Sequence, residues 1–273
     1  MSDLSTLPPL RDVIRDHDLR AEKKLGQNFL LDQNITDKIV RACGDLKGLT
    51  IFEIGPGPGG LTRSLMGSAA DKIIAIEFDD RAVAALQGLI TFGDGRLEVI
   101  KGDALHADLK NMVAAPRAIV ANLPYNISTV LLLKWLEDIW NDSGAYQFMT
   151  LMFQKEVVER LMAKPGTKDY GRLSVMTQWL CHVSKAFDLP PEAFSPPPKV
   201  TSSIAVMKPR ADILKADFAK MEKVLAVAFN QRRKMIRSSM KQFMPQIEEL
   251  GIDPTLRAEN LSVENYVAIA NKI

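Results

Sequence analysis

Three glycines alternate with two prolines in the segment Glu53-Ile-Gly-Pro-Gly-Pro-Gly59, directly after a short apolar stretch from Leu49 to Ile54. Glycines at 55, 57 and 59 allow positive φ angles and let backbone amides approach a ligand that a Cβ atom would exclude. A helical pattern begins at Leu61 and runs to Met66. The sequence therefore predicts a strand, a glycine loop and a helix, which is the first unit of an open α/β sheet.

Strand and helix patterns continue to alternate after this unit. The predicted strands cover residues 72–77, 97–100, 118–121 and 151–153, and the predicted helices cover residues 81–89, 128–140, 155–163 and 173–180. Such alternation indicates a parallel sheet with helices on both faces. Two further strands, at 183–189 and 203–208, are predicted on either side of a proline-rich loop that spans Pro190 to Pro198.

From Asp212 to the end the hydrophobic pattern is helical, with interruptions at Pro245 and Pro254. The sequence therefore predicts two domains. Residues 1–208 would form a Rossmann-like α/β domain, and residues 209–273 a small all-helical domain.

Composition narrows the class of protein. A chain of 273 residues with 47% hydrophobic and 25% charged residues is typical of soluble globular proteins. Cys43 and Cys181 lack the spacing of a disulfide framework or a metal site, which favours a reducing compartment, so we expect the cytoplasm and no bound metal. Neither a signal peptide nor a membrane-spanning run is present in the pattern, and we expect a monomer.

Acidic residues follow the next two predicted strands, where open α/β sheets bind ligands. Glu77, which we expect at a solvent-facing strand end, can accept hydrogen bonds from both ribose hydroxyls of a cofactor. Asp103 is placed to accept from an adenine amino group, and the amide of Ala104 to donate to a ring nitrogen. A dinucleotide fingerprint has Gly-x-Gly-x-x-Gly, whereas here Glu53 precedes the glycines and suits a zwitterionic sulfonium ligand better than a pyrophosphate. The pattern favours S-adenosylmethionine, although the loop alone is also compatible with a plain strand-to-helix turn.

The tetrad Asn122-Leu123-Pro124-Tyr125 follows the fourth predicted strand at the same edge. An adenine amino nitrogen is a poor nucleophile because its lone pair is delocalised into the ring. The Asn122 amide oxygen and the Leu123 carbonyl can accept its two hydrogens and direct the lone pair at a sulfonium methyl group. Tyr125 offers a stacking face for the base. By itself the tetrad is also compatible with a simple β-turn.

Four motifs together resemble a known family in order and spacing. They are Lys24-Leu-Gly-Gln-Asn28-Phe-Leu30, Glu53-Ile-Gly-Pro-Gly-Pro-Gly59, Asn122-Leu-Pro-Tyr125 and Phe194-Ser-Pro-Pro-Pro-Lys-Val-Thr-Ser202. This set is similar to the ribosomal RNA adenine dimethyltransferases of the kasugamycin-resistance type, and the resemblance spans residues 20 to 240.

The resemblance implies dimethylation of two adjacent adenosines in a hairpin near the 3′ end of small-subunit ribosomal RNA, with the immature small subunit as partner. It implies that Phe194 faces Tyr125 across the target base. It also implies a cofactor shell made of Asn28, Leu30, Gly55, Glu77, Phe78, Asp103, Ala104 and Asn122. Two alternatives stay open at this point: a large-subunit ribosomal RNA methyltransferase of the macrolide-resistance type, and a non-catalytic nucleic-acid-binding relative.

The densest positive cluster consists of Arg232, Arg233, Lys234, Arg237 and Lys241. On one continuous helix, residues 233, 237 and 241 would share a face and could contact RNA phosphates. A second candidate patch contains Arg20, Lys23 and Lys24. The net charge of +2 is low for an RNA-binding protein, and either patch could instead be an ordinary solvated surface.

Overall fold

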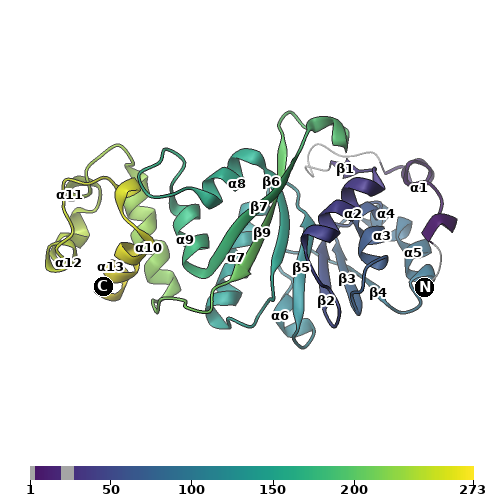
Figure 1. Cartoon of the computed structure of the whole chain (residues 1–273), viewed down its shortest axis with the longest axis horizontal. Coiled ribbons are helices and arrows are strands. Elements are labelled where there is room, and N and C mark those ends of the chain that lie inside the picture. Colours follow the sequence, from purple (N-terminus) through teal and green to yellow (C-terminus); the bar gives the residue numbers. More distant parts are fainter. Residues whose placement is uncertain (1–3, 20–27) are drawn as a thin grey trace.

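The computed structural model describes residues 4–19 and 28–273. In this part of the chain, seven strands form one sheet in the order β4-β3-β2-β5-β6-β9-β7, with helices on both faces (Figure 1). The strands are β2 (Thr50–Ile54), β3 (Lys72–Glu77), β4 (Leu97–Lys101), β5 (Arg117–Asn122), β6 (Met149–Gln154), β7 (Cys181–Leu189) and β9 (Ser202–Pro209). The predicted Rossmann-like sheet is thus confirmed.

The sheet is mixed and not wholly parallel. Strands β2 to β6 are parallel to one another, but β9 is antiparallel to both β6 and β7. The first five strands are joined by helical crossovers, whereas β7 and β9 are joined by the proline-rich loop without one, which allows antiparallel pairing. The prediction of a parallel sheet therefore holds only for the first five strands.

Side chains of the central strands alternate between two hydrophobic clusters. On β2, Phe52 and Ile54 belong to one cluster and Ile51 belongs to the other. Both faces are buried because helices cover both. The helices of the α/β part are α1 (Leu10–Asp16), α2 (Gln33–Ala42), α3 (Gly60–Met66), α4 (Asp80–Ala85), α5 (Gln87–Phe92), α6 (Leu109–Met112), α7 (Ser128–Asn141), α8 (Lys155–Met162) and α9 (Arg172–Leu180).

One predicted helix is two. The segment predicted as a single helix over residues 81–89 forms α4 and α5, which meet at Leu86. The first of them begins where the Asp79 side chain accepts a hydrogen bond from the backbone nitrogen of Arg81. The break leaves Leu86 and Leu89 fully buried next to the glycine loop.

After β9 the regular elements of the described chain are helical. They are α10 (Phe218–Asn230), α11 (Ile236–Ser239), α12 (Met244–Glu249) and α13 (Val263–Asn271), with short 3₁₀ turns between them. Helix α10 begins where Asp217 caps the nitrogen of Lys220. The ring of Phe218 packs against Trp140 and Trp179 at centroid distances of 5.9 and 6.1 Å.

The hydrophobic cluster runs continuously from the α/β part into these helices, through α7, α9 and α10. In Figure 1 they form the yellow-green end of an elongated molecule, with α11 and α12 far from α1. The division into domains at residue 208 stays a prediction.

A small antiparallel pair joins segments that are distant in sequence. Strand β1 (Phe29–Leu30) pairs with β8 (Phe194–Ser195), so that Leu30 lies opposite Phe194. This pair connects two of the four sequence motifs. Arg20, Lys23 and Lys24, predicted as a second basic patch, lie outside the described residues, as does the start of the Lys24 to Leu30 motif.

Candidate active site

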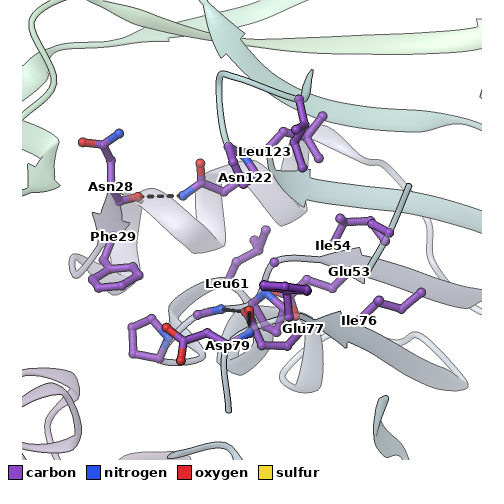
Figure 2. A pocket seen from close by; sticks show the side chains of 18 of the residues that line it. Asn28, Phe29, Glu53, Ile54, Leu61, Ile76, Glu77, Asp79, Asn122 and Leu123 are labelled. Carbon is purple, nitrogen blue, oxygen red and sulfur yellow. Dashed lines mark hydrogen bonds between the residues drawn. The ribbon is translucent and has the colours of Figure 1, made fainter. Parts of the chain in front are cut away.

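A cavity of about 230 Å³ opens at the carboxyl ends of β2, β3, β4 and β5 (Figure 2). This edge is the place where open α/β sheets bind ligands. Every residue that the sequence analysis assigned to the cofactor lines it, together with most of the predicted reaction site: Asn28, Leu30, Gly55, Glu77, Phe78, Asp103, Ala104, Asn122, Leu123 and Tyr125.

The glycine loop has the conformation expected from its sequence. Gly55, Gly57 and Gly59 have φ angles of 65°, 55° and 92°, a region that side chains with a Cβ atom rarely adopt. A Cβ atom on Gly59 would lie 2.5 Å from the Leu89 side chain. The loop is thus restricted to glycine by backbone conformation and by packing.

Glu77 is buried, with 6% of its surface exposed, so the expectation of a solvent-facing position is wrong. Its carboxylate accepts hydrogen bonds from the backbone nitrogens of Gly57 (3.0 Å) and Asp79 (2.8 Å), as Figure 2 shows. Burial raises the pKa of Glu77, and these hydrogen bonds oppose the rise. The side chain therefore ties the glycine loop to the loop after β3, and its remaining lone pairs can still accept from a ribose.

If Glu77 accepts two ribose hydrogen bonds, as the sequence predicts, replacing it by Ala is expected to weaken cofactor binding by about tenfold to a hundredfold. The thermal midpoint should also fall, since Gly57 and Asp79 lose their acceptor. Calorimetric titration with S-adenosylmethionine measures the first effect, with Glu98→Ala, an exposed carboxylate on β4, as the control. An unchanged dissociation constant in the Glu77 variant would remove this residue from the site.

Glu53 is a site residue to which the sequence analysis gave no role beyond favouring a sulfonium ligand. It lines the cavity, is 1% exposed, and its Oε2 atom has no hydrogen-bond partner among the described residues. Burial raises the pKa of Glu53 to about 8. Without a cation nearby, the neutral acid is therefore favoured at neutral pH, whereas a cationic ligand beside this oxygen would stabilise the carboxylate. S-adenosylmethionine carries both an ammonium and a sulfonium group. The polar groups that line the cavity therefore fit this cofactor.

The Asn122 side chain is held in one orientation. Its amide nitrogen donates to the Asn28 carbonyl at 3.1 Å, and Figure 2 shows the amide with its nitrogen toward Asn28 and its oxygen on the other side. Because the nitrogen is engaged in this way, Oδ1 remains the acceptor for a substrate amine. The polar contact also links the tetrad to the Lys24 to Leu30 motif.

Tyr125 and Phe194 lie in different surroundings. The hydroxyl of Tyr125 shares a hydrogen bond of 2.5 Å with the Ser202 hydroxyl, and burial raises the pKa of Tyr125. Phe194 does not line the cavity: it is 4% exposed and belongs to the hydrophobic cluster that contains Leu30 and Leu189. Pairing of β8 with β1 draws this ring inward, so a stacking role would require it to turn out of the cluster.

The predicted basic face does not exist as a single helix. Helix α10 ends at Asn230 and α11 covers only Ile236–Ser239. Arg232 forms an ion pair with Glu259 (2.8 Å), whereas Arg233, Lys234 and Arg237 are exposed. The chain turns between the two helices, so these cations surround a turn at the far end of the molecule from the cavity.

Two other properties bear on the class of protein. Within residues 4–19 and 28–273, no group of three or more His, Cys, Asp or Glu side chains could hold a metal ion. Of the helices in these same residues, none is long and apolar enough to cross a membrane.

Comparison with known proteins shows which family the chain belongs to. A family model described as ribosomal RNA adenine dimethylase matches residues 18–273. Curated relatives named ribosomal RNA small subunit methyltransferase A include one from Mesorhizobium japonicum, 51% identical over 276 residues and 98% of each chain. Another, from Agrobacterium fabrum, is 51% identical over 99% of each chain.

Similar solved structures include a dimethyladenosine transferase from Plasmodium falciparum, with a TM-score of 0.76, 26% identity, and coverage of 88% of this chain and 95% of that chain. A 23S rRNA methyltransferase, ErmE, has a TM-score of 0.66 at 24% identity, with coverage of 90% and 99%, and shares the fold. The family match over nearly the whole chain, together with the identity to full-length relatives, shows that this chain belongs to the ribosomal RNA adenine dimethylase family.

Proposed function

We infer that this protein is an S-adenosylmethionine-dependent ribosomal RNA adenine dimethyltransferase that acts on small-subunit RNA. The observation that carries this inference is the fixed Asn122 amide, which leaves an acceptor for an amine in the cavity. The same cavity contains the Glu53 Oε2 atom, which has no hydrogen-bond partner in the part of the chain that the structure describes. The relatives at 51% identity are named for the small subunit, which favours that substrate over the large-subunit alternative.

The bound cofactor supplies an electrophilic methyl group on its sulfonium. We assign its ribose to Glu77. Its adenine is assigned to Asp103, the Ala104 amide and the exposed ring of Phe78. Its methionine end is assigned to Asn28, the Leu30 backbone and Gly55. Asn122 Oδ1 and the Leu123 carbonyl accept hydrogen bonds from the two N–H groups of the target amine. The amine then presents its lone pair toward the methyl group, and the barrier falls because these acceptors are already oriented.

We also propose that the targets are two adjacent adenosines in a hairpin near the 3′ end of the small-subunit RNA. The proposed partner is the immature subunit in the cytoplasm. The protein acts as a monomer. Arg233, Lys234 and Arg237 are exposed cations at the helical end of the chain and are assigned to RNA phosphates.

The test uses small and large ribosomal subunits, purified separately, from a strain that lacks this protein. Purified enzyme, each kind of subunit and labelled S-adenosylmethionine are combined, and the RNA is digested to oligonucleotides for mass spectrometry. Dimethyladenosine at two neighbouring positions is the expected product. Label confined to large-subunit RNA, or no label in either RNA, would contradict the proposed function.

Removing exposed cations should weaken RNA binding through phosphates. The double variant Arg233→Ala/Lys234→Ala is expected to flatten the dependence of log affinity on log salt by about two units, with cofactor binding unchanged. The control, Lys47→Ala/Lys72→Ala, removes the same charge at the start of β2 and β3, at the opposite edge of the sheet from the cavity. If a salt titration gives the same slope for both double variants, the cluster is an ordinary solvated surface.

A further inference from the structure

The loop between β4 and α6 forms one wall of the cavity, through Asp103, Ala104 and Leu105. Several of its backbone donors are satisfied inside the loop by Asp103. The Asp103 carboxylate accepts from the Leu105 nitrogen (2.9 Å), and its carbonyl accepts from the nitrogens of His106 (3.0 Å) and Ala107 (3.1 Å). These hydrogen bonds pair the backbone N–H groups of the loop. The backbone carbonyl groups after Asp103 need partners from elsewhere in the protein.

Three of those carbonyls converge on a single side chain. Lys134, half-buried on α7, donates from Nζ to the carbonyl oxygens of Ala104 (3.3 Å) and Leu105 (3.0 Å), and also to that of Ala107. A lysine ammonium has three donors and no acceptor, so this arrangement uses its full capacity. Hydrogen bonds from a charged donor are about twice as strong as neutral ones, so these three contacts anchor the loop firmly to α7.

The same helix also contacts the tetrad of the predicted reaction site. Helix α7 begins at Ser128, whose hydroxyl donates to the Tyr125 carbonyl at 3.1 Å. Lys134 lies six residues further on, about 9 Å along the helix axis at 1.5 Å per residue. One rigid element therefore holds the tetrad at its first turn and the Asp103 loop at its second.

We propose that Lys134 is a positioning residue for cofactor binding, which holds the Asp103 to Ala107 loop in the conformation that binds the adenine end of the cofactor. This rests on the proposed function for the identity of the cofactor. Lys134 touches the loop backbone and not the reacting atoms. Its loss should therefore act on cofactor binding, since the contacts of Asn122 with Asn28 and of Ser128 with Tyr125 remain in place.

The test compares Lys134→Met with Lys110→Met. Lys110 on α6 also contacts α7, through Asp138 at 3.7 Å, and it is similarly shielded, with 27% of its side chain exposed. It therefore controls for a general loosening between the loop region and the helix. Lys134→Met is expected to raise the dissociation constant of S-adenosylhomocysteine, and the KM for S-adenosylmethionine, by about tenfold. At saturating cofactor kcat should stay within about threefold, and Lys110→Met should leave all three values near those of the parent.

Hydrogen exchange supplies a readout other than activity. The amides of Leu105, His106 and Ala107 are expected to exchange faster in Lys134→Met than in the parent or in Lys110→Met. Lys134→Gln, which is shorter and uncharged, carries the same test if the methionine variant does not fold. Equal dissociation constants and equal exchange in the parent and a folded Lys134 variant would overturn the proposal, as would the same loss in Lys110→Met. Failure of the parent itself to bind S-adenosylhomocysteine would instead overturn the cofactor assignment.

Discussion

Asn122→Ala is expected to lower the single-turnover rate of methyl transfer by one to three orders of magnitude. The variant removes the Oδ1 acceptor that we propose orients the target amine, and loss of such a preorganised polar contact typically costs about 2–4 kcal/mol of transition-state stabilisation. Saturating cofactor has to be used, because the contact between Asn122 and the Asn28 carbonyl is also lost and cofactor affinity can fall with it. Rapid-quench measurement with labelled cofactor then reports the chemical step.

The control for this variant is Asn111→Ala on α6, where the asparagine side chain donates to Asp108 on the exposed surface. Its rate should equal that of the parent. If Asn122→Ala also transfers methyl groups at the parental rate under saturation, orientation by Asn122 is not the source of activation, and another group must make the amine nucleophilic.

Glu53 should make the stability of the cofactor-free protein depend on pH. Its pKa is raised to about 8 in the folded state, above the ordinary value of 4.5, so the folded state holds this proton more tightly than the unfolded state does. The resulting stabilisation is complete below pH 4.5 and is lost as pH rises through about 8. Relative to Glu53→Gln, the free energy of unfolding of the parent is therefore expected to fall by several kcal/mol over that range, since one pKa unit is equivalent to about 1.4 kcal/mol.

Urea denaturation at pH 5, 6, 7, 8 and 9 measures this difference. Glu98→Gln, which replaces an exposed carboxylate paired with Lys72, should track the parent at every pH. Parallel curves for the parent and Glu53→Gln would show that Glu53 ionises in the folded protein as it does in water. Its oxygen would then be hydrated and would not need a cationic ligand as a partner.

Much of the α/β core could be predicted because its signals are local. Strand β3 has the bounds that the apolar run predicted, and the positive φ angles of Gly55, Gly57 and Gly59 follow from a turn that only glycine tolerates. The position of Asp103 and Asn122 at one edge also follows, because parallel strands bring their carboxyl ends together.

The remaining parts depend on contacts between distant segments. Phe194 has a proline-rich loop as its local sequence, yet its pairing with Leu30 places the ring in the core. Nothing in the sequence near Lys134 distinguishes it from a solvated lysine on a helix. Its partners are carbonyls about thirty residues earlier in the chain, and backbone carbonyls leave no residue-specific signal.

Backbone sterics and hydrophobic periodicity act over a few residues, so the sequence by itself determined the first five strands of the sheet and the glycine loop. The family and the residue types at the cavity came from the resemblance of its motifs. Only the tertiary structure decided the burial and the hydrogen-bond partners of these residues. Glu77 is buried between two loops, Arg232 forms an ion pair, and Oε2 of Glu53 has no hydrogen-bond partner within residues 4–19 and 28–273. Burial and hydrogen bonding depend on which distant segments meet, and these set the charge state and orientation on which the chemistry depends.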